Sequence, residues 1–244
     1  MDTLVAKWQV PSKVVAFSTT RQGGVSKAPF ASLNLAQHVN DNLLDVAENR
    51  KRLTSLLPQT PFWLSQTHST RVVCVDEQTD SNQLYDADAL YTQQVNQPLA
   101  IMTADCLPVF VCSKQGDEVA VIHAGWRGLL NGVIENTLNC FKSSQLIAYL
   151  GAAIGPQKFE VGDDVKNAFC NKHEDAISCF QPIDDKPNKY LANIYQLAHI
   201  VLEKQGVSSI SGGEYCTVTQ HDVFFSYRRD GATGRNAHII YIAD

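Results

Sequence analysis

The sequence predicts a single domain of the mixed α/β class that spans residues 1–244. Stretches rich in β-branched and aromatic residues alternate with stretches of helical periodicity along the whole chain. No Pro-, Gly- or Ser-rich linker, low-complexity stretch or internal repeat divides it. Hydrophobic residues make up 44% of the sequence and charged residues 18%, which is typical of a globular protein with a sizeable core.

Seven segments have the composition of β-strands, namely residues 13–20, 70–77, 98–112, 118–124, 145–154, 222–229 and 237–243. The third is long and almost wholly apolar, which predicts a strand buried on both faces. A polar Thr-Ala-Asp-Cys sequence at residues 103–106 interrupts it. Such a conflict between local pattern and environment is typical of functional sites.

Three segments have the periodicity of amphipathic helices. The first is predicted from Asp45 to Leu57, with Asp45 and Glu48 at capping-box spacing and a proline directly after it. The second covers residues 129–141 and the third residues 191–202, with Gly206 as the expected C-terminal stop.

Charge and composition exclude several classes of protein. The net charge of −5 does not favour nucleic acid or an anionic membrane surface as a partner. The N-terminal residues contain no apolar run of signal-peptide length, and no run approaches the roughly 20 apolar residues of a membrane span, so we expect a cytoplasmic protein. Seven cysteines without a C-x-x-C pair argue against a disulfide scaffold.

Residues 119–130, VAVIHAGWRGLL, predict a strand, a tight loop and a helix. His123 ends the strand, and the flanking Gly125 and Gly128 would let the backbone approach a ligand closely. Alone, His123 would be interpreted as a hydrogen-bonded core residue. Two further residues of ligand type, His68 and Cys106, also lie at predicted strand edges. Together the three fit a catalytic zinc site with an open fourth position, and equally a Cys106 nucleophile with a histidine base.

A series of motifs carries a family resemblance, in the order TTRQGGVSKAPFASLNLAQHVND, SQTHS, DADALYT, MTADCLPV, AVIHAGWRG, GAAIGPQKFEVG and FFSYRRDGATGR. They cover residues 19–235 and resemble the laccase-domain, or polyphenol-oxidase-like, family of purine nucleoside phosphorylases with adenosine deaminase activity. The resemblance implies a four-layer α/β/β/α sandwich with mixed sheets, similar to the cysteine-hydrolase fold of the cytotoxic-necrotizing-factor type. It also implies zinc held by His68, Cys106 and His123. The usual tyrosine before Glu-Val is Phe159 here, so a substrate contact from that hydroxyl would be missing.

The resemblance implies that the substrates are purine nucleosides (adenosine, inosine, guanosine and methylthioadenosine) and phosphate. Arg21, next to two glycines, resembles the family's phosphate-contacting arginine, and an arginine fork suits phosphate oxygens. The other candidates for substrate contact are Gln66, Trp126, Arg127, Glu160, Arg228 and Arg229. Asp105 and Glu160 are candidate proton carriers. Each candidate also has an alternative role that is purely structural. Trp126 would pack in the core, and the arginines would hold a loop or lie in solvent. Asp105 and Glu160 would hold a histidine or cap a loop.

Other functions remain open at this stage. A copper polyphenol oxidase would use the same His-Cys-His set with copper instead of zinc, but the seven histidines include no H-x-H pair for an oxygen-reducing cluster. A Cys-His hydrolase that edits peptidoglycan precursors would use Cys106 as nucleophile and His123 as base. A non-enzymatic metal- or nucleoside-binding module is a third class. The sequence leaves the oligomeric state open.

Overall fold

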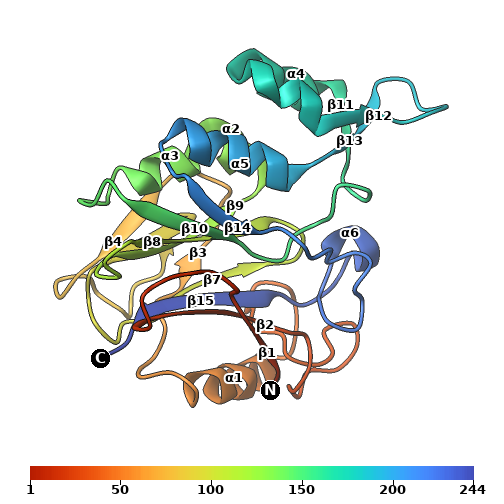
Figure 1. The fold of residues 1–244 in the computed structure, drawn as a ribbon. Helices are drawn as coiled ribbons and strands as arrows, with labels where there is room; N and C mark the ends of the chain where they lie inside the picture. Colours follow the sequence, from red (N-terminus) through yellow and green to blue (C-terminus); the bar gives the residue numbers. More distant parts are fainter.

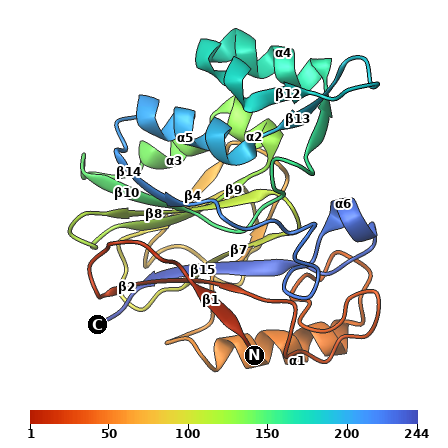
Figure 2. The ribbon, with the colours of Figure 1, turned by 45° about the vertical axis from the view of Figure 1, so that its right-hand side comes forward.

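Two β-sheets lie face to face at the centre of the computed structural model, which describes residues 1–244. The six-stranded sheet has the order β14-β10-β8-β9-β6-β4, and the four-stranded sheet the order β1-β2-β15-β7. Helices α2, α3 and α5 cover the outer face of the six-stranded sheet, and α1 covers the four-stranded sheet (Figures 1 and 2). This is the predicted four-layer α/β/β/α sandwich.

The strands of the six-stranded sheet are β4 (Val72–Val75), β6 (Ala89–Thr92), β8 (Leu107–Ser113), β9 (Val119–Ala124), β10 (Leu146–Leu150) and β14 (Ser209–Gly212). The four-stranded sheet contains β1 (Thr3–Val5), β2 (Val14–Thr19), β7 (Leu99–Thr103) and β15 (Asn236–Ile242). The helices are α1 (Leu43–Thr54), α2 (Trp126–Asn131), α3 (Val133–Leu138), α4 (Asp163–Lys172), α5 (Ile194–Lys204) and α6 (Tyr227–Asp230), with the 3-10 helix η1 (Glu174–Cys179).

A small three-stranded sheet stands at one end of the sandwich, with α4 beside it (Figure 1). Its strands are β11 (Glu160–Gly162), β13 (Lys189–Ala192) and β12 (Phe180–Pro182), and sequence reasoning missed both this sheet and α4. The short strands β3 (Leu64–Ser65) and β5 (Tyr85–Asp86) form a further parallel pair. None of the helices is long and apolar enough to cross a lipid bilayer.

Three layers of buried side chains hold the sandwich together, one at each boundary between layers. In β8, Val109 and Val111 face the helices while Phe110 and Cys112 face the other sheet. This alternation follows from the two-residue repeat of a strand, and burial on both faces explains the continuous apolar sequence.

The predicted strand 98–112 is wrong in one respect, because it forms two strands, β7 and β8, in different sheets. Both are buried throughout, as predicted. The chain changes sheet at residues 104–106, where Asp105 adopts a φ of 99°. The polar interruption therefore marks the point where the chain leaves one sheet for the other.

The predicted strand 222–229 is wrong. These residues form a loop and the single turn of α6, and the apolar composition reflects the full burial of Phe224 and Phe225. The predicted helix 129–141 is split into α2 and α3 by Gly132, whose φ of 107° ends one helix and begins the other.

The first predicted helix begins two residues earlier than expected, because Asn42, and not Asp45, caps it by accepting a hydrogen bond from the backbone N–H of Leu44. Strands β2, β4, β9, β10 and β15 confirm the remaining strand predictions. Helix α5 ends just before Gly206, whose φ of 82° confirms the predicted stop. All seven cysteines are free thiols.

Candidate metal centre

His123 lies near the end of β9, buried between β6 and β8, with Pro108 opposite it in the strand pairing. Asp88, directly before β6, fixes the imidazole in place. Nδ1 of His123 lies 2.8 Å from Oδ1 of Asp88, and the backbone N–H of His123 donates to the carbonyl oxygen of Asp88 at 2.7 Å. A carboxylate that accepts from Nδ1–H leaves Nε2 free to bind a metal.

The same carboxylate also organises the loop that carries His68. Asp88 is fully buried and accepts hydrogen bonds from the backbone N–H groups of Thr67, His68 and Ser69, and from the Ser69 hydroxyl at 2.7 Å. Burial would raise the pKa of Asp88, but the hydrogen bonds from His123 and Ser69 outweigh it and lower the pKa to about 2. A single carboxylate therefore fixes both histidines of the centre.

Cys106 brings the third candidate ligand to the same point from the turn between β7 and β8. Its Sγ lies 3.7 Å from Nε2 of His68, and the rings of His68 and His123 are 4.8 Å apart between centroids. One ligand-type atom from each of the three residues lies within 4.8 Å of the others. The structure thus brings together the three residues that the sequence analysis selected.

The charges at the centre favour a thiolate. Burial would raise the pKa of Cys106, but the charge of His123 and its hydrogen bonding, helped by His68, lower the pKa to about 6. Burial would likewise lower the pKa of His123, but Cys106 and Asp88 raise it to about 9. In the metal-free protein the centre is therefore a thiolate next to an imidazolium.

The donor set and the space around it fit a small, borderline-soft cation. One thiolate and two imidazoles are ligands that zinc and copper both accept. Gly125 leaves the necessary room, because a Cβ at this position would lie 2.8 Å from Cδ2 of His68 and 3.2 Å from Sγ of Cys106. The residues present therefore fit a metal ion.

Two cavities meet at this centre and share His68, Ala104, Cys106 and Tyr227 as walls. The first, of about 310 Å³, is lined further by His38, Gln66, Met102, Thr103, His123 and Arg235, and we call it the polar cavity. The second, of about 300 Å³, is lined further by Asp105, Trp126, Arg127, Ile154, Phe159, Ile194 and Arg228, and we call it the apolar cavity.

Besides the candidate metal ligands His68 and Cys106, four of the predicted site residues line the apolar cavity: Asp105, Trp126, Arg127 and Arg228. The Arg127 guanidinium stacks over the Trp126 ring at 4.2 Å. The Asp105 carboxylate is already occupied, because it accepts from the Thr217 hydroxyl and from the backbone N–H of Arg228, each at 2.6 Å. Asp105 thus holds α6 and a neighbouring loop against the turn that carries Cys106.

Gln66 lines the polar cavity, but both ends of its amide are engaged. Its Nε2 donates to the carbonyl oxygen of Met102 at 2.8 Å, and its Oε1 accepts from the Met102 backbone N–H at 2.7 Å. The side chain therefore ties the His68 loop to β7.

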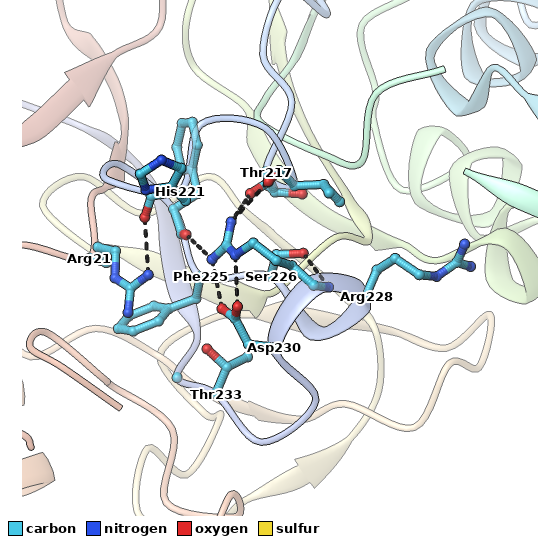
Figure 3. A network of polar contacts seen from close by, with 12 residues as sticks. Arg21, Thr217, His221, Phe225, Ser226, Arg228, Asp230 and Thr233 are labelled. Carbon is cyan, nitrogen blue, oxygen red and sulfur yellow. Dashed lines mark hydrogen bonds and ion pairs between the residues drawn. The ribbon is translucent and has the colours of Figure 1, made fainter. Parts of the chain in front are cut away.

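The structure does not bring Arg21, Arg229 or Glu160 into either cavity. Arg21 donates to the carbonyl oxygens of Ala31 and His221 at 2.9–3.0 Å and stacks on Phe225 (Figure 3).

Arg229 donates to the Thr217 and Phe224 carbonyl oxygens and pairs with Asp230 at 2.7 Å, whereas Arg228 points away from this network (Figure 3). Glu160 forms an ion pair with Lys186 at 2.8 Å. The contacts of Arg21 and Arg229 hold loops together, so these two guanidinium groups have few N–H donors left for a ligand.

Sequence reasoning missed Asp88, His38 and Arg235. Each lies in a segment that already stood out, since Asp88 belongs to DADALYT, His38 to the segment ending AQHVND, and Arg235 ends FFSYRRDGATGR. A residue pattern alone does not show which of several polar residues in such a segment faces the ligand.

Comparisons with known proteins place these features in a wider group. A family model described as multi-copper polyphenol oxidoreductase laccase matches residues 15–243. A Haemophilus influenzae protein named purine nucleoside phosphorylase is 48% identical over 245 residues, 99% of each chain. An Escherichia coli protein named purine nucleoside phosphorylase YfiH is 46% identical over 243 residues, 98% of each chain. The crystal structure of a Neisseria meningitidis protein of the DUF152 family matches with a TM-score of 0.93 and 42% identity over 100% of both chains.

Proposed function

The chain belongs to the multi-copper polyphenol oxidoreductase laccase family, and from this premise we propose that it is a zinc-dependent purine nucleoside phosphorylase that also deaminates adenosine. The names of relatives that are 46–48% identical along the whole chain support the first activity. One structural observation carries the proposal, namely the His68–Cys106–His123 set, fixed by Asp88, at the junction of two cavities. We further propose that residues 1–244 act as one domain.

The apolar cavity has the character of a purine site. Trp126 and Phe159 offer aromatic surface for a flat base, and Ile154 and Ile194 exclude water around it. The guanidinium group of Arg127 lies at the same cavity and can donate to ring nitrogens or hydroxyl groups. The guanidinium group of Arg228 lies there too, but it already donates to the carbonyl oxygens of Lys158 and Glu160 at 3.2–3.4 Å. The set of adenosine, inosine, guanosine and methylthioadenosine as substrates follows from the family resemblance.

Phosphorolysis exchanges one bond for another at the sugar. An oxygen of hydrogen phosphate forms a bond to C1′ while the bond from C1′ to N9 of the purine breaks. The bonding electrons stay on N9, and the proton of hydrogen phosphate ends on the departing base. The chain's contribution is to hold phosphate and nucleoside in line and to exclude water, which converts a bimolecular step into an intramolecular one.

Deamination concerns the other end of the nucleoside. When bound, a zinc ion would supply a Lewis acid that activates water near neutral pH, which suits attack on C6 of adenine. Asp88 keeps the Nδ1 proton of His123 in place, so that Nε2 of this side chain stays available as a ligand.

A Cys-His hydrolase acting on peptidoglycan precursors is a second candidate. The low pKa of Cys106, about 6, and its distance of 3.7 Å from Nε2 of His68 favour it in the metal-free protein. A bound metal would occupy the same thiolate as a ligand. Metal content therefore separates the two candidates.

The test combines metal analysis with product analysis. The protein as purified should contain about one zinc per chain, and the Cys106→Ala variant should contain much less. With adenosine, adenine and ribose 1-phosphate should form only when phosphate is present, and inosine should form without it. A protein that is inert towards nucleosides, or that oxidises phenols with oxygen consumption when loaded with copper, would overturn the proposal.

A further inference from the structure

Two partly buried arginines near the metal centre have no acidic partner. Arg235 lines the polar cavity, and Arg50 projects from α1 and stacks over Trp63 at 4.4 Å. No carboxylate lies within 4.0 Å of either guanidinium. A partly desolvated cation without a counter-charge is costly unless an anion joins it, so this cluster requires an explanation.

Arg235 has donors to spare. Its Nη1 donates to the carbonyl oxygens of Thr233 and Gly234 at 2.9 and 3.0 Å, and its backbone N–H donates to the Asn34 side chain at 3.0 Å. These bonds fix the side chain from behind, while Nε and Nη2 donate to no protein acceptor. A guanidinium held in this way presents a planar pair of free N–H donors.

His38 adds a third nitrogen-bearing side chain to the same wall of the cavity. Burial, Arg235 and Arg50 all lower the pKa of His38, which shows that its surroundings are cationic. Burial lowers the pKa of Arg235 more than the charges of Cys106 and Asp105 raise it, and neither group forms an ion pair with the guanidinium. The two oxygens of Asp105 accept from the Thr217 hydroxyl and the backbone N–H of Arg228 instead.

We propose that Arg235 and His38, with Arg50 close to His38, form a binding site for a phosphate group in the polar cavity, which the His68–Cys106–His123 set also lines. This deepens the proposed function and rests on it for the role of the phosphate, because it gives the second substrate a place. The two guanidinium groups match a dianion in charge, the neutral His38 imidazole can donate one further hydrogen bond, and the Arg235 fork matches two oxygens of a tetrahedral anion.

The position of the proposed phosphate site suits in-line attack on C1′ of a nucleoside whose base lies in the apolar cavity. The polar cavity and the apolar cavity share Cys106 and Tyr227 as walls, so a base in the apolar cavity places the sugar at their junction. A phosphate held by Arg235 would then reach C1′ from the polar cavity. The anion and the leaving base occupy separate cavities, as displacement at C1′ requires.

The direct test measures binding of inorganic phosphate by calorimetry without nucleoside, so that no turnover is involved. Arg235→Gln should raise the Kd of phosphate roughly 10- to 100-fold, the scale for losing charge-assisted hydrogen bonds. Arg52→Gln is the matched control, because it removes the same charge from the exposed face of α1. Wild-type metal content in both variants shows that they are folded. An unchanged Kd in a folded Arg235→Gln variant overturns the proposal.

A second pair of variants avoids the buried arginine altogether. His38→Glu places a carboxylate at an exposed position against Arg235 and should abolish measurable phosphate binding. Gln37→Glu adds the same charge one residue away, outside the cavity lining, and should leave the Kd within about twofold because water screens exposed charges. Equal losses in the two variants would point to net charge alone and overturn the assignment.

The same measurement identifies the source of the phosphate group. If the site takes free phosphate, adenosine and phosphate bind together. If it takes the phosphate of a nucleotide, AMP binds more tightly than adenosine in an Arg235-dependent manner and displaces phosphate. Phosphate binding that depends on Arg235 without any purine release would sustain this site and reject the phosphorylase. Purine release with an unchanged KM for phosphate in Arg235→Gln would sustain the phosphorylase and reject this phosphate site.

Discussion

At the scale of single residues, Asp88 fixes the geometry of the candidate metal centre from outside the ligand set. It binds Nδ1 of His123 at 2.8 Å and also holds the backbone around His68. Loss of an acidic partner of a ligating histidine typically costs metal affinity 10- to 100-fold.

Asp88→Asn should therefore weaken zinc binding by roughly 10- to 100-fold in a chelator competition assay. Asp86→Asn, two residues earlier and exposed, is the matched control and should bind zinc like the wild type. Equal zinc affinity in Asp88→Asn and the wild type would show that the ligands hold their geometry without this carboxylate.

A second residue-scale prediction concerns the pH dependence of Cys106 in the metal-free protein. A thiol whose pKa is lowered to about 6 is a thiolate above that pH, so its alkylation by iodoacetamide should accelerate as the pH rises through about 6. The rate should approach a plateau above about pH 7, and bound zinc should suppress it.

The Cys106→Ser variant supplies the correction for other thiols, of which Cys74 is exposed. A midpoint above about pH 8, near that of an ordinary thiol, would contradict the thiolate–imidazolium description.

The sequence was sufficient to predict that His68, Cys106 and His123 lie together, because all three stand at predicted strand edges within motifs of the family resemblance. It does not show that the guanidinium groups of Arg21 and Arg229 donate to backbone carbonyls of surrounding loops, so the substrate contacts of these two arginines stay predictions. Whether an arginine faces a ligand or holds a loop depends on which loops meet, and a local pattern does not contain that information.

At the scale of secondary-structure elements, the junction between β9 and α2 leaves room for the side chains of the candidate metal centre. Gly125 has a φ of −60°, which any residue adopts, so its importance lies in the missing Cβ. That atom would meet His68 at 2.8 Å and Cys106 at 3.2 Å.

Gly125→Ala should therefore displace a ligand and lower zinc content without unfolding the protein, as measured by metal analysis and circular dichroism. Gly128→Ala is the control, since a Cβ there would approach the Ser69 carbonyl oxygen at 3.1 Å and neither of those two ligands. Full zinc occupancy in Gly125→Ala would show that the junction adapts to the extra atom.

Element prediction succeeded where periodicity reflected a single environment, as in β2, β9, β15 and α5. It failed at residues 98–112, because two strands buried on both faces have the same apolar composition as one long strand. It failed at residues 222–229, because Phe224 and Phe225 are buried by a loop and not by a sheet. An apolar composition indicates that a segment is buried. Whether that segment is a strand or a loop depends on its hydrogen-bonded pairing with other strands.

At the scale of the whole molecule, a metal held by the three candidate ligands would join separate parts of the sandwich. His68 precedes β4, Cys106 joins the two sheets, and His123 ends β9. A ligand that binds only the folded state adds about 3–4 kcal/mol at roughly 100 to 1,000 times its Kd.

For a domain of this size, zinc should therefore raise Tm by roughly 5–15 °C over the metal-free protein in a thermal unfolding scan. The Cys106→Ala variant should show little or no shift, since it lacks a ligand. A similar rise in that variant would place the stabilising ion elsewhere.

The four-layer arrangement came from family resemblance, because the order of strands in a sheet depends on contacts between distant residues. The pairing of β15 with β2 illustrates this point, since His238 lies opposite Ser18 and hydrogen-bonds to it at 2.7 Å. Nothing in either segment alone specifies the other as its neighbour.

This pairing also governs the order of events during biosynthesis. β15 lies between β2 and β7, so the four-stranded sheet has a gap until residue 242 has left the ribosome. All three metal ligands are synthesised by residue 123, yet β7, the strand that leads to Cys106, lacks its partner until then. A nascent chain stopped before residue 236 exposes two unpaired strand edges, the kind of surface that chaperones and proteases recognise. We therefore expect such incomplete chains to be recognised by quality control in the cell, although they already contain all three candidate ligands.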